Sequence, residues 1–141
     1  VVCDYLVQKS RPQLFSNALP PAVCYGSMAA IDVLRKEPQR LEKLRANTKQ
    51  FRAGVADLGL KTIDGITPIV PVIVGETATA IRMQKALLEE GVFVSGFGYP
   101  VVPKGEARLR CQISAGHEPA DIETALKALK KVAEKFPESR A

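Results

Sequence analysis

The chain has few of the residues from which metal sites and disulfide scaffolds are built. Its 141 residues include a single histidine, His117, and three cysteines, Cys3, Cys24 and Cys111, which lie far apart without a metal-ligand spacing. A site with several histidine ligands is therefore excluded within the chain, and we expect no metal. The odd number of scattered cysteines argues against a disulfide scaffold and is typical of a reducing compartment.

Aromatic residues are also scarce, at 6% of the chain, and no run is long and apolar enough to cross a membrane. The net charge is +5, but lysine and arginine are spread along the chain instead of clustering with aromatic residues, as a base-stacking surface requires. We therefore expect no nucleic acid and no membrane among the partners, and the charge suits anionic small molecules. Because the chain does not begin with methionine, we expect it to start inside a longer protein.

The composition that remains is that of a globular domain, with 46% apolar and 25% charged residues. Apolar periodicity and turn residues predict, in order, a helix over 37–58, strands over 61–63 and 69–74, a helix over 77–90, strands over 92–95 and 107–114, and a helix from Pro119. Pro71 predicts an edge or bulged position for its strand. The order predicts the α+β class, a small and mostly antiparallel sheet with helices on one face.

The segment before residue 37 has a different pattern. A helix is predicted over 22–34, after the pair Pro20-Pro21, because proline is tolerated in a first helical turn. This helix is apolar nearly all round, so it must be buried on every side. The chain offers too little material to cover it, and we expect a missing domain or a subunit interface.

The strand over 107–114 carries the clearest candidate for ligand binding. Side chains alternate along a strand, which puts Arg108, Arg110 and Gln112 on one face and Leu109, Cys111 and Ile113 on the other. An arginine held on a rigid strand is a good clamp for a carboxylate, because its planar fork matches the two oxygens. The alternative is a half-buried strand with solvated arginines. Cys111 alternates with apolar neighbours, which favours a buried structural thiol.

Two segments carry more specific sequence motifs. Residues 11–22 read RPQLFSNALPPA, and residues 99–110 read YPVVPKGEARLR, followed by SAGH at 114–117. Both resemble the α-oxoamine synthases, pyridoxal-phosphate (PLP) enzymes of the aspartate-aminotransferase fold, and the resemblance covers the whole chain. The motifs LFSN and YPVVPKG are most similar to those of the glycine C-acetyltransferases of that family, also called 2-amino-3-ketobutyrate coenzyme A ligases.

The resemblance implies a PLP fold type I enzyme with PLP as cofactor. Residues 1–36 would be the end of its large domain and the connecting helix, and residues 37–141 its C-terminal small domain. Arg110 would bind the α-carboxylate of the substrate, and Ser16 would reach the cofactor phosphate of the neighbouring subunit in a homodimer. His117 also fits the family pattern; a direct role and a hydrogen bond near a helix start both remain open for it.

The implied reaction interconverts glycine plus acetyl-CoA and 2-amino-3-oxobutanoate plus CoA, in threonine degradation, in a bacterial cytoplasm or a mitochondrial matrix. No catalytic residue of the family lies in this chain, since the Schiff-base lysine is expected upstream of Val1, and the chain alone is predicted to be inactive. The alternatives are another α-oxoamine synthase, such as 8-amino-7-oxononanoate synthase, a free-standing small-molecule-binding α+β module, or an interaction domain in which Arg110 is only a surface charge.

Overall fold

The computed structural model describes residues 1–11 and 17–140. The chain divides into two compact units, unit 1 over Val1–Pro38 and unit 2 over Gln39–Ala141. This division does not test the expected assignment of the first segment to a larger domain, which stays a prediction.

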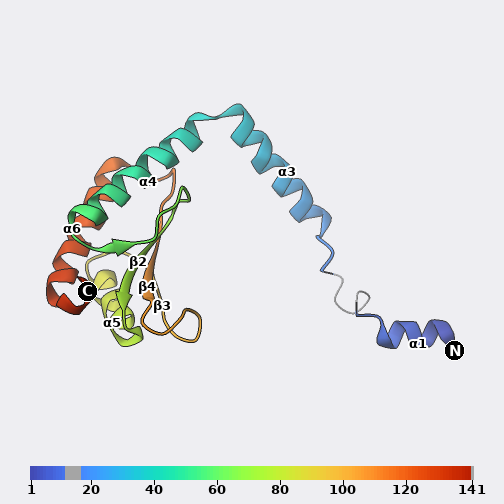
Figure 1. The fold of residues 1–141 in the computed structure, drawn as a ribbon. Coiled ribbons are helices and arrows are strands. Elements are labelled where there is room, and N and C mark those ends of the chain that lie inside the picture. Colours follow the sequence, from blue (N-terminus) through green and yellow to red (C-terminus); the bar gives the residue numbers. More distant parts are fainter. Residues whose placement is uncertain (12–16, 141) are drawn as a thin grey trace. The chain divides into compact units, whose positions relative to one another are not determined.

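Unit 1 is helical in the part that the structure describes. Helix α1 spans Val2–Lys9 and helix α3 spans Pro21–Lys36 (Figure 1). Helix α3 starts at Pro21, one residue earlier than expected, with the proline at a position whose missing N–H costs no intrahelical bond. Neither of these two helices contains a buried residue. Unit 1 therefore has no core of its own among its described residues.

Unit 2 has the predicted α+β architecture. Its elements are α4 (Gln39–Asp57), β1 (Lys61–Thr62), β2 (Ile69–Gly75), α5 (Thr77–Glu89), β3 (Ser95–Phe97), β4 (Ala107–Gln112), α6 (Pro119–Lys135) and a short 3-10 helix (Pro137–Arg140). The four strands form one antiparallel sheet in the order β1-β2-β4-β3. The prediction of a small antiparallel sheet with helices on one face is confirmed.

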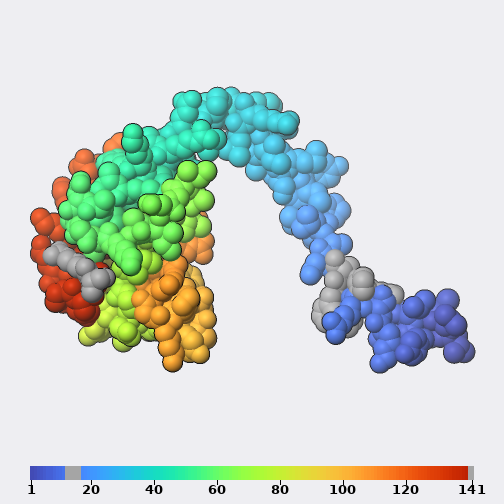
Figure 2. Space-filling model, in the orientation of Figure 1, coloured from blue at the N-terminus to red at the C-terminus, as the bar shows by residue number. Residues whose placement is uncertain are grey.

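The core of unit 2 fills the space between one face of the sheet and helices α4, α5 and α6. Leu109 and Cys111 of β4 point into it, together with side chains from each of these helices, such as Val55, Met83 and Leu129. The space-filling view shows unit 2, coloured green to red, as one continuous body (Figure 2). Alternation along β4 thus decides which side chains are buried and which are left for the other face.

Strand β2 lies between β1 and β4, but the expected edge position holds locally at Pro71, and the register of β2 with β4 shifts between Ile73 and Gly75. Strand β1 ends at Thr62, opposite Val72, so β2 has no strand neighbour beside Pro71 on that side. On the other side Pro71 lies opposite Arg110. The Ile113 N–H donates to the Pro68 carbonyl at 2.9 Å, so these two residues form a hydrogen-bonded pair. Hydrogen-bonded and non-hydrogen-bonded pairs alternate along an antiparallel ladder, which makes Pro71–Arg110 a non-hydrogen-bonded pair. The missing proline N–H therefore costs the ladder no bond.

The strand predicted over 92–95 begins later, since β3 runs from Ser95 to Phe97. Gly91, at φ 81°, follows the C-terminal end of α5, and the Val92 N–H donates to the Leu87 carbonyl at 2.8 Å. Val92 is therefore used to close the preceding helix and is not available to the sheet. Because β3 starts at Ser95, the first residue of this strand lies beside Arg110.

Candidate functional site

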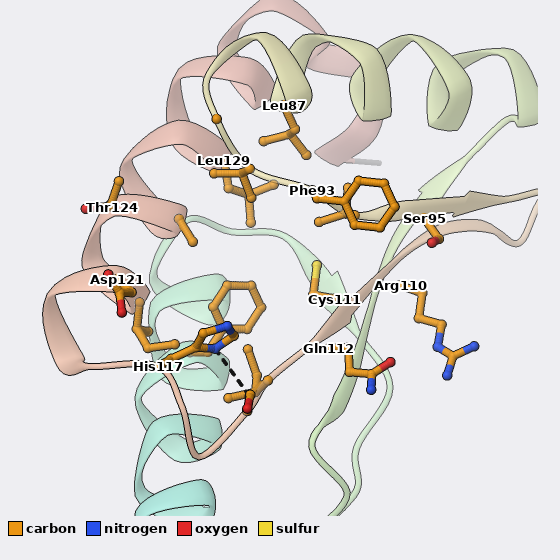
Figure 3. Close-up of a pocket in the computed structure, with 18 residues that line it drawn as sticks. Leu87, Phe93, Ser95, Arg110, Cys111, Gln112, His117, Asp121, Thr124 and Leu129 are labelled. Atoms are coloured by element: carbon orange, nitrogen blue, oxygen red, sulfur yellow. Dashed lines mark hydrogen bonds between the residues drawn. The ribbon is translucent and has the colours of Figure 1, made fainter.

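Arg110 lies in a row of side chains that crosses three strands on the face away from the helices. It is opposite Pro71 of β2 and Ser95 of β3. Gln112 follows two residues later on the same face, opposite Ile69. Figure 3 shows Arg110 and Gln112 extending on the other side of β4 from the Cys111 thiol. The predicted division of this strand into two faces is confirmed.

The two arginines of β4 have different surroundings. Arg108 donates from Nε to the Glu106 carbonyl at 3.0 Å and from Nη2 to the Glu106 carboxylate at 2.9 Å, and its side chain is only 19% exposed. Arg110 is exposed, and among the described residues it has no hydrogen-bond or ion-pair partner. A guanidinium on a rigid strand without a partner is free to bind an anion in bidentate fashion. The structure therefore distinguishes Arg110 from Arg108 as the ligand-binding candidate.

A cavity of 670 Å³ lies beside this strand (Figure 3). Arg110 and Gln112 line it together with apolar side chains of the helix layer, such as Leu87 and Leu129, and with His117. None of the described residues that line it is a lysine. The lining thus includes the donors Arg110 and Gln112 and the carboxylate of Asp121, and among the described residues it offers no amine to which a carbonyl compound could be attached.

Two side chains of helix α5 fix strand β3 and the loop after it. The Gly96 N–H donates to the Gln84 side-chain carbonyl at 2.7 Å, and the Tyr99 N–H donates to the Thr77 hydroxyl at 3.1 Å. A Cβ on Gly98 would lie 2.3 Å from Thr77, so only glycine fits there. These contacts hold Ser95 beside Arg110. The sequence did not identify Ser95, Gln84 or Thr77, because the start of β3 was expected three residues early.

His117 closes the turn between β4 and α6. Its Nδ1 accepts a hydrogen bond from the Ser114 N–H at 3.2 Å, and buried Asn47 donates to the carbonyls of Ser114 and His117 at 3.1 and 2.8 Å. The turn is thereby tied to α4, just before α6 begins at Pro119. This is the hydrogen bond near a helix start that the sequence left open; a direct role for His117 stays a prediction.

Cys111 is a structural thiol, as its pattern predicts. It is buried on the helix side of β4, and burial raises the pKa of its thiol to about 12. At neutral pH the thiol is protonated and is a poor nucleophile. Among the described residues no group of three or more potential ligands could hold a metal ion, and no helix is long and apolar enough to span a bilayer.

Comparison with known proteins assigns the family. Residues 1–129 match the model of aminotransferase class I and II. The chain belongs to this family. It is 43% identical over 133 residues to the 8-amino-7-oxononanoate synthase/2-amino-3-ketobutyrate coenzyme A ligase of Thermus thermophilus, covering 94% of this chain and 34% of the relative. It is 46% identical over 134 residues to the 8-amino-7-oxononanoate synthase of Trichlorobacter lovleyi, with the same two coverages.

Both relatives are α-oxoamine synthases, and the chain spans about a third of their length. A solved structure of SPT with its PLP internal aldimine superimposes with a TM-score of 0.80 at 28% identity, over 96% of this chain and 35% of that chain. The expected fold, the small domain of a PLP fold type I enzyme, is confirmed. The finer expectation of glycine C-acetyltransferase is not specifically supported, since these names refer mainly to 8-amino-7-oxononanoate synthase.

PLP is the cofactor of this family. The residues around Arg110 suit a substrate carboxylate, but they do not by themselves provide the attachment that the cofactor needs, because no lysine is among the described residues that line the cavity. Ser16, the expected phosphate contact, lies outside the described residues. Among the described residues, the structure therefore shows the surroundings of Arg110 and, in the lining of its cavity, no residue that could attach the cofactor.

Proposed function

We propose that the chain is the C-terminal part of a PLP-dependent α-oxoamine synthase in which Arg110 binds the α-carboxylate of the amino-acid substrate. The observation that carries this proposal is the exposed guanidinium of Arg110, which has no partner among the described residues, on a strand whose other arginine is paired with Glu106. Membership of the aminotransferase class I and II family supports it.

The contribution of Arg110 is orientation. A bidentate clamp fixes the plane of the carboxylate and, with it, the direction of the bonds at the neighbouring carbon, and such positioning lowers a barrier by several kcal/mol. When bound, PLP supplies the electron sink for charge that develops at that carbon. Ser95 and Pro71, on either side of Arg110 in the sheet, leave the head of the arginine accessible, because both side chains are short.

The reaction we propose joins glycine and acetyl-CoA to give 2-amino-3-oxobutanoate and CoA, or runs in reverse. The segment from Tyr99 to Gly105 supports this choice by its resemblance to glycine C-acetyltransferases, and one relative carries the ligase name as well. A second candidate is 8-amino-7-oxononanoate synthase, which the names of both relatives favour.

The full protein we propose is a homodimer, in which Ser16 reaches the cofactor phosphate of the second subunit. Helix α3 supports a covered position for unit 1, because large apolar side chains along it are exposed, among them Val23, Met28 and Ile31. A contiguous apolar surface of this kind is typical of a protein interface. We propose that the rest of the longer protein and the second subunit cover it.

The decisive assay uses the full-length protein loaded with PLP. Incubation with glycine and acetyl-CoA should release CoA and form 2-amino-3-oxobutanoate, detected by mass spectrometry. Formation of 8-amino-7-oxononanoate, CO2 and CoA from alanine and a seven-carbon dicarboxylic acyl-CoA, without turnover of glycine and acetyl-CoA, would select the second candidate. The 141-residue chain alone should show no turnover and no covalent cofactor–lysine linkage after reduction with borohydride; a linkage that maps to a single lysine would contradict the proposal.

A further inference from the structure

We propose that Gln112 is a second binding residue for the ligand carboxylate, acting beside Arg110. The inference rests on the proposed function of Arg110 and extends the site by one donor. It is carried by the position of Gln112 on the sheet, by the lack of a partner for its side chain and by the open space beside it.

The position follows from the alternation of β4. Arg110 and Gln112 are two residues apart, so they point to the same face, with their Cα atoms about 7 Å apart. Both line the same cavity, and Figure 3 shows them extending on the same side of the strand. Both side chains are long enough to bridge this distance, so a group as small as a carboxylate can contact the two together.

The amide of Gln112 is available for a ligand. Its side chain is exposed and has no hydrogen-bond partner among the described residues. Two other glutamines of unit 2 are engaged: Gln84 accepts from the Gly96 N–H, and Gln50 donates to the Pro119 carbonyl. Among the described residues, the amide of Gln112 thus makes no hydrogen bond that stabilises unit 2.

The sheet also leaves room at this point. Strand β3 begins at Ser95, opposite Arg110, so beside Gln112 the β3 side of β4 has no strand. On the other side the neighbour is Ile69, an apolar residue that cannot compete for the amide. Phe93, two residues before Ser95, has a largely exposed side chain, and the space next to Gln112 is the cavity that Arg110, Gln112 and Phe93 line together.

The chemistry fits the carboxylate. A carboxylate has two oxygens and about four acceptor positions, of which the guanidinium fork uses two. The amide NH2 of Gln112 donates to a third position without adding charge. Because this bond forms to the bound substrate before and during the reaction, its loss should weaken glycine binding more than it lowers the rate at saturation.

The test is a glycine titration of the full-length PLP holoenzyme, followed by the absorbance of the cofactor. Gln112→Met keeps the length of the side chain and removes the amide, and it should raise the glycine Kd about tenfold. Gln112→Glu should raise it further, because a second carboxylate repels the ligand. In both variants the glycine Kd should change by a larger factor than kcat at saturating glycine.

Two controls separate binding from structure. Gln39→Met makes the same chemical change at an exposed position at the start of α4 and should leave the glycine Kd unchanged. Methylamine, which lacks a carboxylate, should bind the wild type and Gln112→Met equally. A lower affinity for both probes would mean that the variant disturbs the site generally, and it would overturn the proposal.

The outcomes also distinguish this proposal from the function on which it rests. A change of about twofold in the glycine Kd is smaller than the contribution of one hydrogen bond. If Arg110→Lys weakens glycine binding and the Kd of Gln112→Met stays within that range, only the role of Gln112 is overturned. If Arg110→Lys binds glycine as tightly as the wild type, the carboxylate site itself is overturned, and Gln112 with it.

Discussion

Units 1 and 2 contain similar kinds of apolar residues and use them differently. In unit 2 alternation and helical spacing bring these residues into one core, which includes Val55, Met83 and Leu109. In unit 1 neither described helix buries a residue, although α3 is apolar around most of its circumference. Because burial of apolar surface is the main favourable term in folding, the stabilising core of the described residues lies in unit 2.

The difference explains where the chemistry can be seen. In unit 2 the sheet places Arg110 between Pro71 and Ser95, so the face that we propose binds the ligand is formed by the described residues. Unit 1 carries Ser16, whose proposed partner belongs to another subunit. Of the two residues that the family resemblance assigns to substrate and cofactor, only Arg110 lies among the described residues.

The largest contrast expected between the units is in thiol reactivity. In the isolated chain Cys3 and Cys24 of unit 1 are exposed, whereas Cys111 of unit 2 is buried. Burial lifts the pKa of the Cys111 thiol from 9.0 to about 12, which at pH 8 lowers its thiolate fraction about 1000-fold. We expect iodoacetamide to modify Cys3 and Cys24 within minutes and Cys111 only after unfolding, as read by peptide mass spectrometry.

The labelling of Cys111 should also change with pH, in one direction. Because burial holds the pKa of Cys111 at about 12 in the folded state and the exposed thiol ionises near 9.0, stability should fall as the pH rises above 9.0, and labelling of Cys111 should increase there through unfolding. In the full-length protein Cys24 should become protected, if helix α3 is covered as proposed. Equal labelling of Cys24 in the isolated chain and in the full-length protein would contradict the account of unit 1.

The next contrast is in core truncation. Leu109→Ala should lower the free energy of unfolding of the isolated chain by about 2–5 kcal/mol, because Leu109 is fully buried and the substitution leaves a cavity. The matched substitution in unit 1, Leu34→Ala, should change it by less than about 0.5 kcal/mol, since Leu34 is exposed. Urea denaturation followed by circular dichroism measures both, and equal losses would remove the distinction between the units.

The smallest contrast uses one helical glycine from each unit. In Gly54→Ala of α4 the new Cβ would lie 2.3 Å from Leu126, so the substitution should cost about 1–3 kcal/mol. In Gly26→Ala of α3 the new Cβ meets nothing within 4 Å, and the better helix propensity of alanine should stabilise the helix by about 0.5–1 kcal/mol. Thermal melts of the two variants should shift in opposite directions; shifts of the same sign would contradict this difference in packing.

These regions also differ in how far the sequence predicts them. The division of β4 into two faces followed from alternation alone, and the burial of Leu109 and Cys111 confirms it. The neighbour of Arg110 on β3 could not be predicted, because Val92 was counted as a strand residue and instead closes helix α5. The prediction of an edge or bulged position for Pro71 holds locally, because β1 stops one position before it, although β2 lies inside the sheet.

The alternation of β4 alone does not distinguish the two arginines. Arg108 and Arg110 occupy equivalent positions in the alternation, and only the ion pair of Arg108 with Glu106 shows that one is engaged and the other free. The resemblance pointed to Arg110 by its place in the motif. The structure supports the same residue by an independent argument, its lack of a partner among the described residues.

The most direct test of the account compares Arg110→Lys with Arg108→Lys in the full-length PLP holoenzyme. Lysine keeps the charge but loses the bidentate geometry, so Arg110→Lys should raise the glycine Kd by about 10- to 100-fold. Arg108→Lys, whose side chain is held by Glu106, should change it by less than about threefold. Unchanged glycine binding in Arg110→Lys, or an equal loss in both variants, would contradict the assignment of Arg110 as the carboxylate-binding residue.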